Sequence, residues 1–300
     1  MLSDEDPVTL SVIPWFHVYG LASMMCVSLL GHNIVTMPYF DEKEFLRAIE
    51  VSARTCSSNQ IKKSDRSILQ KYKVNNILGV PPLVVMLAKS KLVDNYDLSS
   101  LRVIVCGAAP LSSELANAVL ERLNLMAVFQ GFGMSEMTLA VLQQTPDSCT
   151  PGSVGKLRPE MFGKIVDPDT NELLGPNERG EMCFKGASIM KGYIGDNAAT
   201  KSTIDAEGWL HTGDIGYYND DHEWFIVDRI KELIKYKGFQ VPPAELEALL
   251  LTHDKIAEAA VIGIPDEVSG ELALGFVILQ KGAKLTEQEV LDFVAGKLTK

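Results

Sequence analysis

The stretch "QGFGMSEMT", Gln130–Thr138, combines residue types that a packed core does not require. Its two glycines allow a ligand to approach the backbone closely. Its aromatic ring offers a flat face to a base, its serine can donate to a phosphate oxygen, and its carboxylate suits a divalent metal. These groups are Gly131 and Gly133, Phe132, Ser135 and Glu136. The alternative is a glycine turn leading into a helix capped by serine and glutamate, and the residues alone leave both interpretations about equal.

Three further stretches carry candidate groups. "CGAAPLS", Cys106–Ser112, places small residues after an apolar run and could form a floor for a flat group. "GWLHTGD", Gly208–Asp214, ends in a carboxylate suited to accept two ribose hydroxyls. "VDRIKELIKYKG", Val227–Gly238, sets Arg229 at a junction and follows it with Lys231, Lys235 and Lys237. A turn, a hairpin corner and solvated lysines would explain each one singly, but the four in this order are hard to explain that way.

Other catalytic patterns are missing from the sequence. It contains no GxxxxGK[ST], GxGxxG or HExxH, so neither a P-loop nor a dinucleotide fingerprint is predicted. "GMSEM" resembles a nucleophile elbow, but Met137 replaces the second glycine, which argues against a serine hydrolase. The five cysteines are scattered without a CxxC or Cys/His cluster. We therefore expect neither a disulfide framework nor a zinc site, and a reducing, intracellular compartment.

Composition limits the class of protein. Hydrophobic residues make up 46% and charged residues 22%, as in ordinary globular proteins. The net charge of -11 argues against nucleic acid or an anionic membrane as the main partner. The start, "MLSDEDPV", lacks the basic and apolar regions of a signal peptide. The apolar run Val18–Leu30 is too short to span a bilayer, so we expect a buried helix there and no transmembrane segment.

Short apolar runs alternate with helical segments in the first half of the chain. The runs are "VTLSVIP", "HNIVTM", "KVNNILGVPP" and "LRVIVCGAAP", and helical segments lie around Leu83–Ser90 and Ser112–Asn124. Buried strands typically end in such Gly/Pro loops. The pattern predicts an α/β core in which helices cover both faces of a mostly parallel sheet.

The second half has a different texture. Residues 151–228 contain "FGKIVDPDTNELL" and "GEMCFKG", which predict a β-rich subdomain. Beyond it we expect a hairpin in "ELIKYKGFQV", a helix in "PPAELEALLLTH" with proline at its start, and strands in "IAEAAVIGI" and "LALGFVILQ". A last helix opens with a Thr286/Glu289 capping box. We therefore expect a large domain over 1–229 and a small α+β domain over 230–300.

The segment Val51–Gln70 is polar and basic and interrupts a helix that would otherwise join the next strand directly. One explanation is a solvated surface insertion, which loops tolerate well. The other, which we favour, is a retained intron: valine codons begin with GT, glutamine can be encoded as CAG, and twenty codons keep the frame.

These motifs together resemble those of the AMP-forming acyl/aryl-CoA synthetases, the adenylating superfamily that includes 4-coumarate–CoA ligases and firefly luciferases. The resemblance covers nearly the whole chain apart from 51–70. It implies that Gln130–Glu136 is the adenine and phosphate motif, with Phe132 near adenine, Ser135 at a phosphate and Glu136 supporting Mg²⁺. The small residues that would line the adenine and acyl pocket are Gly107, Ala108 and Ala109.

The resemblance also assigns roles outside these loops. Asp214 and Arg229 would bind ribose, and Lys231 would lie at a hinge. Lys235 and Gly238 would serve a second, thioester-forming conformation of a C-terminal lid domain. His17, in "WFHVYG", matches the family histidine beside the substrate carboxylate, whereas without the resemblance it would pass for a core histidine.

By resemblance, a fatty or aryl acid reacts with ATP to give an acyl-adenylate, and coenzyme A then displaces AMP. The family's phosphate-gripping lysine loop and its late adenylation lysine find no match here, so we expect a chain truncated at both ends. The alternative is an inactive nucleotide-binding or interaction protein. "FHVYG" and "CGAAP" resemble the ligases more than the luciferases, so luciferase-like oxidation is not expected. The family implies a peroxisomal or cytoplasmic location.

Overall fold

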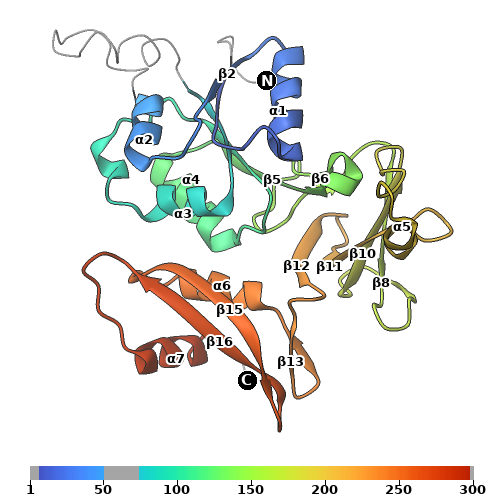
Figure 1. The fold of residues 1–300 in the computed structure, drawn as a ribbon. Coiled ribbons are helices and arrows are strands. Elements are labelled where there is room, and N and C mark those ends of the chain that lie inside the picture. The colour runs from blue at the N-terminus through green and yellow to red at the C-terminus, as the bar shows by residue number, and fades with distance from the viewer. Residues whose placement is uncertain (1–6, 51–73, 298–300) are drawn as a thin grey trace, which may run out of the picture. The chain divides into compact units, whose positions relative to one another are not determined.

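The protein is described by a computed structural model that covers residues 7–50 and 74–297. It divides into two compact units (Figure 1). Unit 1 comprises residues 1–159 and 188–191, and unit 2 comprises residues 160–187 and 192–300. The predicted insertion at 51–70 lies outside the described residues. The domain boundary that we expect at residue 229 falls within unit 2.

Unit 1 is built on one seven-stranded sheet. The strand order is β2-β1-β3-β4-β5-β6-β7, and the first five strands in this order are parallel. Their bounds are β1 Val8–Ser11, β2 Asn33–Thr36, β3 Asn76–Gly79, β4 Val103–Cys106, β5 Ala127–Met134, β6 Leu139–Gln143 and β7 Lys156–Leu157. Strands β6 and β7 continue the sheet in antiparallel fashion. The prediction of a mostly parallel sheet is confirmed.

Helices cover both faces of this sheet, and the topology determines which face each one takes. The bounds are α1 Val18–Leu29, α2 Glu42–Glu50, α3 Pro81–Lys89 and α4 Ser113–Leu123. The chain steps from β1 to β2 in one direction and then back through β3, β4 and β5 in the other. Because such crossovers are right-handed, α1 lies on one face and α2, α3 and α4 lie on the other (Figure 1).

The core of unit 1 forms where α2 and the strands meet. Phe45, Leu46 and Ile49 recur at helical spacing on α2 and are fully buried. On the sheet, Leu10 and Ile77 are register partners and are also fully buried. Both sets of side chains belong to the buried core of unit 1.

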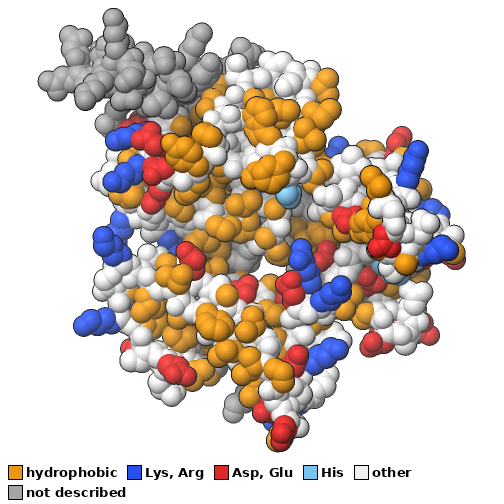
Figure 2. Space-filling model, viewed as in Figure 1, with side chains coloured by type: hydrophobic (Ala, Val, Ile, Leu, Met, Phe, Trp, Pro, Cys, Tyr) orange, Lys and Arg blue, Asp and Glu red, His pale blue; other side chains and the backbone are white. Residues whose placement is uncertain are grey.

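Helix α1 forms as expected, but the prediction that it is buried is wrong. In the described part of the chain only Gly20 of this helix is buried. Leu21, Met25 and Leu29 are exposed, and Figure 2 shows hydrophobic side chains gathered over α1. An apolar run alone does not distinguish a helix enclosed on all sides from one whose outer face is apolar. None of the helices in residues 7–50 and 74–297 is long and apolar enough to cross a membrane.

Unit 2 contains two sheets. The first has the order β12-β11-β10-β8-β9 and is antiparallel throughout. Its strands are β8 Met161–Val166, β9 Leu173–Leu174, β10 Gly180–Gly186, β11 Leu210–Tyr218 and β12 Trp224–Arg229, and α5, Asn197–Thr203, lies between β10 and β11 in the chain. The "DPDTN" turn forms between β8 and β9, where Asp167 accepts from the amides of Asp169 and Thr170.

The second sheet has the order β14-β13-β16-β15. Its elements are β13 Ile234–Tyr236, β14 Phe239–Val241, α6 Pro243–Leu251, β15 Ile256–Asp266, β16 Gly270–Leu279 and α7 Glu287–Ala295. The hairpin, the proline at the start of α6 and the Thr286/Glu289 capping box are all confirmed. Buried Ile234, Leu250 and Ile256 form the small core between this sheet and its helices.

Asp228 joins the end of β12 to the start of α6. One carboxylate oxygen accepts from Arg229 N at 2.7 Å and the other accepts from Ala244 N at 2.9 Å. The second bond satisfies an amide of the first turn of α6, and a negative charge there is favoured by the helix dipole. The buried Asp228 therefore sets where the chain leaves the first sheet of unit 2.

The fold makes a prediction at Gly20. A Cβ built there lies 2.3 Å from the carbonyl oxygen of Pro14, because the loop before α1 returns against the helix. Alanine normally stabilises a helix relative to glycine by about 1 kcal/mol. Here we expect Gly20→Ala to lower the free energy of unfolding by about 1–3 kcal/mol. Urea denaturation checks this, with Ser23→Ala as the control on the same helix. A stabilised Gly20→Ala variant would contradict the close approach.

Candidate functional site

The small residues after β4 form a short loop at the carboxyl end of the parallel strands. Gly107 N donates to Gly79 O at 3.2 Å, which links the ends of β4 and β3. Ala108 has φ 72°, a left-handed conformation that alanine adopts at a cost. Ala108 and Ala109 are exposed. In open parallel sheets, ligands bind at this edge.

Tyr19, which the sequence analysis did not single out, supports that loop. Its hydroxyl donates to Val105 O at 2.8 Å. Its ring lies where a Cβ at Gly107 would make ordinary contact, 3.5 Å from Cε1. Burial raises the pKa of Tyr19 well above its usual value, so the phenol stays protonated and remains a donor. Tyr19 therefore holds the end of β4 against α1.

Gln130 faces inward rather than toward solvent. Its side-chain oxygen accepts from Leu111 N at 3.2 Å, and its backbone N donates to the side-chain oxygen of Gln144 at 2.8 Å. Gln144 in turn donates to Thr150 O at 2.7 Å. Both glutamines are almost completely buried. The contacts of Gln130 thus hold the loop Gly107–Leu111 in place.

The glycines of "QGFGMSEMT" are required by close backbone packing, which the sequence alone did not reveal. A Cβ at Gly133 would lie 1.5 Å from Leu139 O, and one at Gly131 would lie 3.1 Å from Leu142 O. The sheet carries a bulge between Phe132 and Gly133. These glycines are needed because the β6 backbone passes close to them.

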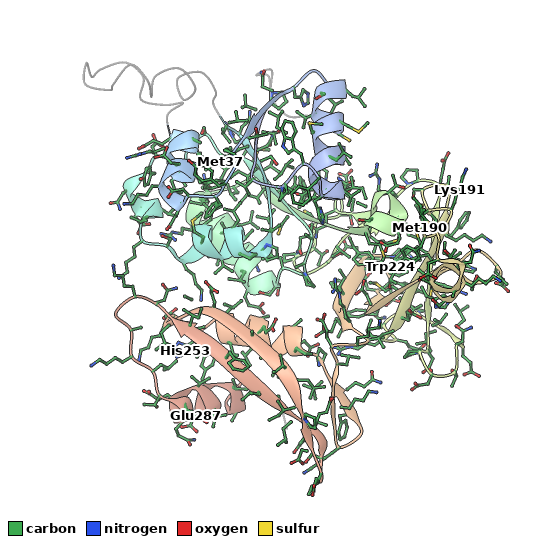
Figure 3. All side chains as sticks on the ribbon, viewed as in Figure 1. Met37, Met190, Lys191, Trp224, His253 and Glu287 are labelled. Atoms are coloured by element: carbon green, nitrogen blue, oxygen red, sulfur yellow. The ribbon has the colours of Figure 1, made fainter. Side chains whose placement is uncertain are left out.

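After β5 the chain makes one short 3-10 turn, η2, Ser135–Met137. Met137 is fully buried and anchors the turn, Ser135 is exposed, and Glu136 is half-buried. The segment 188–191 packs here: Met190, labelled in Figure 3, donates its amide N to Glu136 O at 2.8 Å. The hydroxyl of Thr138 donates to Ser188 O at 2.7 Å. The turn thus fixes the backbone at Ser135 and Glu136.

His17 is the N-cap of α1. Its Nδ1 accepts from Tyr19 N at 3.1 Å, so the neutral ring carries its proton on Nε2. The side chain is exposed, as are those of Trp15 and Phe16 beside it. His17 is therefore a surface residue of unit 1, which disposes of the core-histidine alternative, and its Nε2–H is available to an acceptor.

In unit 2, Asp214 of β11 and Arg229 of β12 are direct cross-strand partners. Arg229 Nε lies 3.7 Å from Asp214 Oδ1. The side chain of Asp214 is only 16% exposed, whereas that of Arg229 is 69% exposed. No residue in the described ranges donates a hydrogen bond to the Asp214 carboxylate. Asp214 is thus a half-buried acid whose oxygens still have capacity for donors.

Burial raises the pKa of Asp214 to about 6. Arg229 opposes this shift, while Glu232, Asp228 and Glu181 add to it. The backbone that carries Asp214 is held by its neighbours. Asp214 N donates to Thr212 Oγ1 at 3.0 Å, and Gly213 N donates to a Glu181 oxygen at 2.9 Å.

The remaining predicted residues lie further along unit 2. Lys231 is exposed just after β12. Lys235 lies exposed on β13, with its backbone N bonded to Glu271 at 2.6 Å. Gly238, at φ 84°, forms the β13–β14 turn together with Lys237. His17, Gly107–Ala109 and Gln130–Glu136 therefore belong to unit 1, and Asp214, Arg229, Lys231, Lys235 and Gly238 belong to unit 2.

Residues 2–194 match the family model described as AMP-binding enzyme, and residues 245–300 match the AMP-binding enzyme C-terminal domain. The chain is 45% identical over 290 residues to the luciferin 4-monooxygenase of Nipponoluciola cruciata, covering 97% of this chain and 49% of that protein. It is 47% identical over 301 residues to the 4-coumarate:CoA ligase 1 of Petunia hybrida, covering 98% and 52% respectively.

Among solved structures, ATP-bound MatB from Rhodopseudomonas palustris superposes with a TM-score of 0.81 at 27% identity. That match covers 98% of this chain and 54% of that one. The chain therefore spans about half the length of the relatives it matches.

The raised pKa of Asp214 predicts a pH-dependent stability. Its folded-state pKa of about 6 exceeds the ordinary 3.8, so the charged carboxylate opposes folding above pH 6 by up to about 3 kcal/mol. This penalty disappears as the pH falls from about 6 to 3.8, because the carboxyl then becomes protonated in the folded protein. We expect Asp214→Asn to be more stable than the wild type at neutral pH, with a gain that shrinks below pH 6. Calorimetry at neutral pH and below pH 6 measures this gain in stability. The exposed Asp221→Asn is the control, and an equal gain at every pH would contradict the assignment.

Proposed function

Because the chain belongs to the family of AMP-binding enzymes, we propose that it takes part in activating a carboxylic acid with ATP and transferring the acyl group to coenzyme A. The observation that carries this proposal is Asp214: a half-buried carboxylate, opposite Arg229, that accepts no hydrogen bond from the described residues. A ribose diol supplies two hydroxyl donors, which suit the two carboxylate oxygens. The cost of burying Asp214 would then be offset when the nucleotide binds.

The loops of unit 1 would receive the base, the phosphate and the metal. Gly107, Ala108 and Ala109 leave room for a flat group, and Phe132 would lie near adenine. Ser135 is exposed and its hydroxyl would donate to a phosphate oxygen. Glu136 offers the hard carboxylate oxygen that Mg²⁺ takes alongside nucleotide phosphates, so the residue fits the ion. When bound, Mg²⁺ neutralises phosphate charge.

His17 would hold the substrate carboxylate. Its Nδ1 is occupied by the amide of Tyr19, so the exposed Nε2–H is the atom that would donate to a carboxylate oxygen. The neutral tautomer is fixed by the cap geometry before any ligand arrives. The acid itself would be aryl or fatty, by likeness to the ligases.

The last strands of unit 2 would serve the thioester step. In a hinge motion a few residues at the ends of elements absorb the backbone change. Lys231 lies at such a position, two residues after the end of β12. Lys235 and Gly238 would then contribute to the second conformation, in which coenzyme A attacks the acyl carbon and AMP leaves. We assign the peroxisome or the cytoplasm as the place of action by likeness to the family alone.

Oxidation of a luciferin adenylate is a second candidate, because identity to the luciferin 4-monooxygenase is 45%, close to the 47% for the ligase. Light emission with luciferin and ATP would favour it, and formation of aryl-CoA without light would favour the ligase.

The nucleotide assignment predicts a loss of affinity in two variants. We expect Asp214→Asn and Arg229→Ala each to weaken binding of AMP or a non-hydrolysable acyl-adenylate analogue about tenfold or more, because each removes a charge-assisted hydrogen bond. Isothermal titration calorimetry on the 300-residue chain measures this. The exposed Asp169→Asn and Lys201→Ala are matched controls. Asp214→Asn should remain folded, so unchanged affinity in both variants would refute the ribose role.

A further inference from the structure

Three side chains of unit 2 that the proposed function does not use meet on the β10–β11 pair. Glu181 and Cys183 lie on β10, and His211 lies on β11. His211 Nδ1 is 2.7 Å from Glu181 Oε2 and 3.4 Å from Cys183 Sγ. One ligand atom from each of the three lies within 4.8 Å of the other two.

Strand geometry explains why they meet. Residues two apart on a strand point to the same face, so Glu181 and Cys183 share one. Cys183 and His211 are register partners across the antiparallel pair. The register shifts between Glu181 and Cys183, which marks a bulge at the cluster. All three side chains are buried or half-buried.

We propose that Glu181, Cys183 and His211 form a binding site for a thiophilic divalent cation, of which Zn²⁺ fits best. A thiolate, an imidazole and a carboxylate are the three kinds of ligand that Zn²⁺ takes in proteins. The thiolate disfavours Mg²⁺ and Ca²⁺, which prefer oxygen. A water molecule would complete the tetrahedron.

A fourth residue supports this site independently. Asp205 Oδ2 lies 3.7 Å from His211 Nε2, the ring nitrogen that faces away from the cluster. Asp205 is itself oriented, because its Oδ1 accepts from Glu207 N and Trp209 N at 2.9 Å each. Metal-binding histidines generally donate their second ring N–H to such a carboxylate. The cluster therefore has the outer partner of a metal site as well as the ligands.

The distances require a small adjustment. Around tetrahedral Zn²⁺, nitrogen and oxygen ligands lie roughly 3.3 Å apart and nitrogen and sulfur roughly 3.6 Å apart. The pair His211–Cys183, at 3.4 Å, is nearly in place. The pair His211–Glu181, at 2.7 Å, is a hydrogen bond that must open as the ion replaces its proton.

Protons balance in this exchange. Burial raises the pKa of the Cys183 thiol to about 12, so the free protein holds it protonated at neutral pH. On binding, the thiol proton passes to solvent and sulfur coordinates as thiolate. The proton between His211 Nδ1 and Glu181 leaves that position when the ion binds, and the Nε2–H of the coordinated ring faces Asp205.

The test is titration of Zn²⁺ into the 300-residue chain after chelator treatment, under a reductant that does not bind metal. We expect one site per chain. Cys183→Ser and His211→Asn should weaken it by more than the roughly 10–100-fold loss expected when Asp205→Asn removes the outer partner. Cys149→Ser, at an exposed cysteine, should leave affinity unchanged. Absence of Zn²⁺ binding by the wild-type chain would overturn the proposal. So would a Zn²⁺ affinity in Cys183→Ser and His211→Asn that equals that of the wild type.

Co²⁺ gives a second measurement that leaves the cluster intact. Thiolate coordination produces a charge-transfer band in the near ultraviolet. A variant with Cys26, Cys56 and Cys149 all replaced by serine keeps Cys183 and Cys106. We expect the band to persist in this variant and to disappear when excess Zn²⁺, whose d shell is full, replaces Co²⁺ at the site. Loss of the band in the triple variant would place the thiolate elsewhere and refute the site.

Discussion

The arrangement of unit 1 depends on one buried pair of amides, Gln130 and Gln144. Through three hydrogen bonds they join β5 to the loop Gly107–Leu111, to β6 and to Thr150. Neutral amides offer both donors and acceptors, so the pair satisfies backbone groups on several segments without burying a charge. Removing either amide would leave buried polar groups unpaired, which costs more than the bond itself contributes. These buried hydrogen bonds therefore hold in place the loops that could receive a nucleotide.

Unit 2 uses the opposite strategy at Asp214. There the fold buries a charge with one long ion pair to Arg229, and without a hydrogen-bond donor from the described chain. Such an arrangement opposes folding and suits binding, because a ligand that brings donors relieves a cost already present in the free protein. Two hydrogen bonds hold the backbone of β11 in place beside Asp214: Asp214 N donates to Thr212 Oγ1, and Gly213 N donates to Glu181.

Local rules of sequence predicted the elements well and the tertiary contacts less well. The parallel sheet, the β13–β14 hairpin and the Thr286 capping box follow from alternation, turn residues and spacing. The inward orientation of Gln130 and the crowding of Gly133 by β6 depend on strand pairing, which the sequence does not display. The exposed face of α1 was missed because hydrophobicity alone does not reveal what covers it. The cluster at His211 was missed for a similar reason: its partners lie 28 and 30 residues away in the sequence.

Glu181 bonds with both of its oxygens, one to Gly213 N beside Asp214 and one to the ring of His211. Because Glu181 is shared, binding at the His211 cluster and binding at Asp214 would each change the affinity of the other. Whatever pulls Glu181 toward His211 must alter the backbone bond next to Asp214, and occupancy at Asp214 must act back on the ring by the same factor. The coupling would lie within unit 2, since the Glu181 side chain on β10 contacts both places.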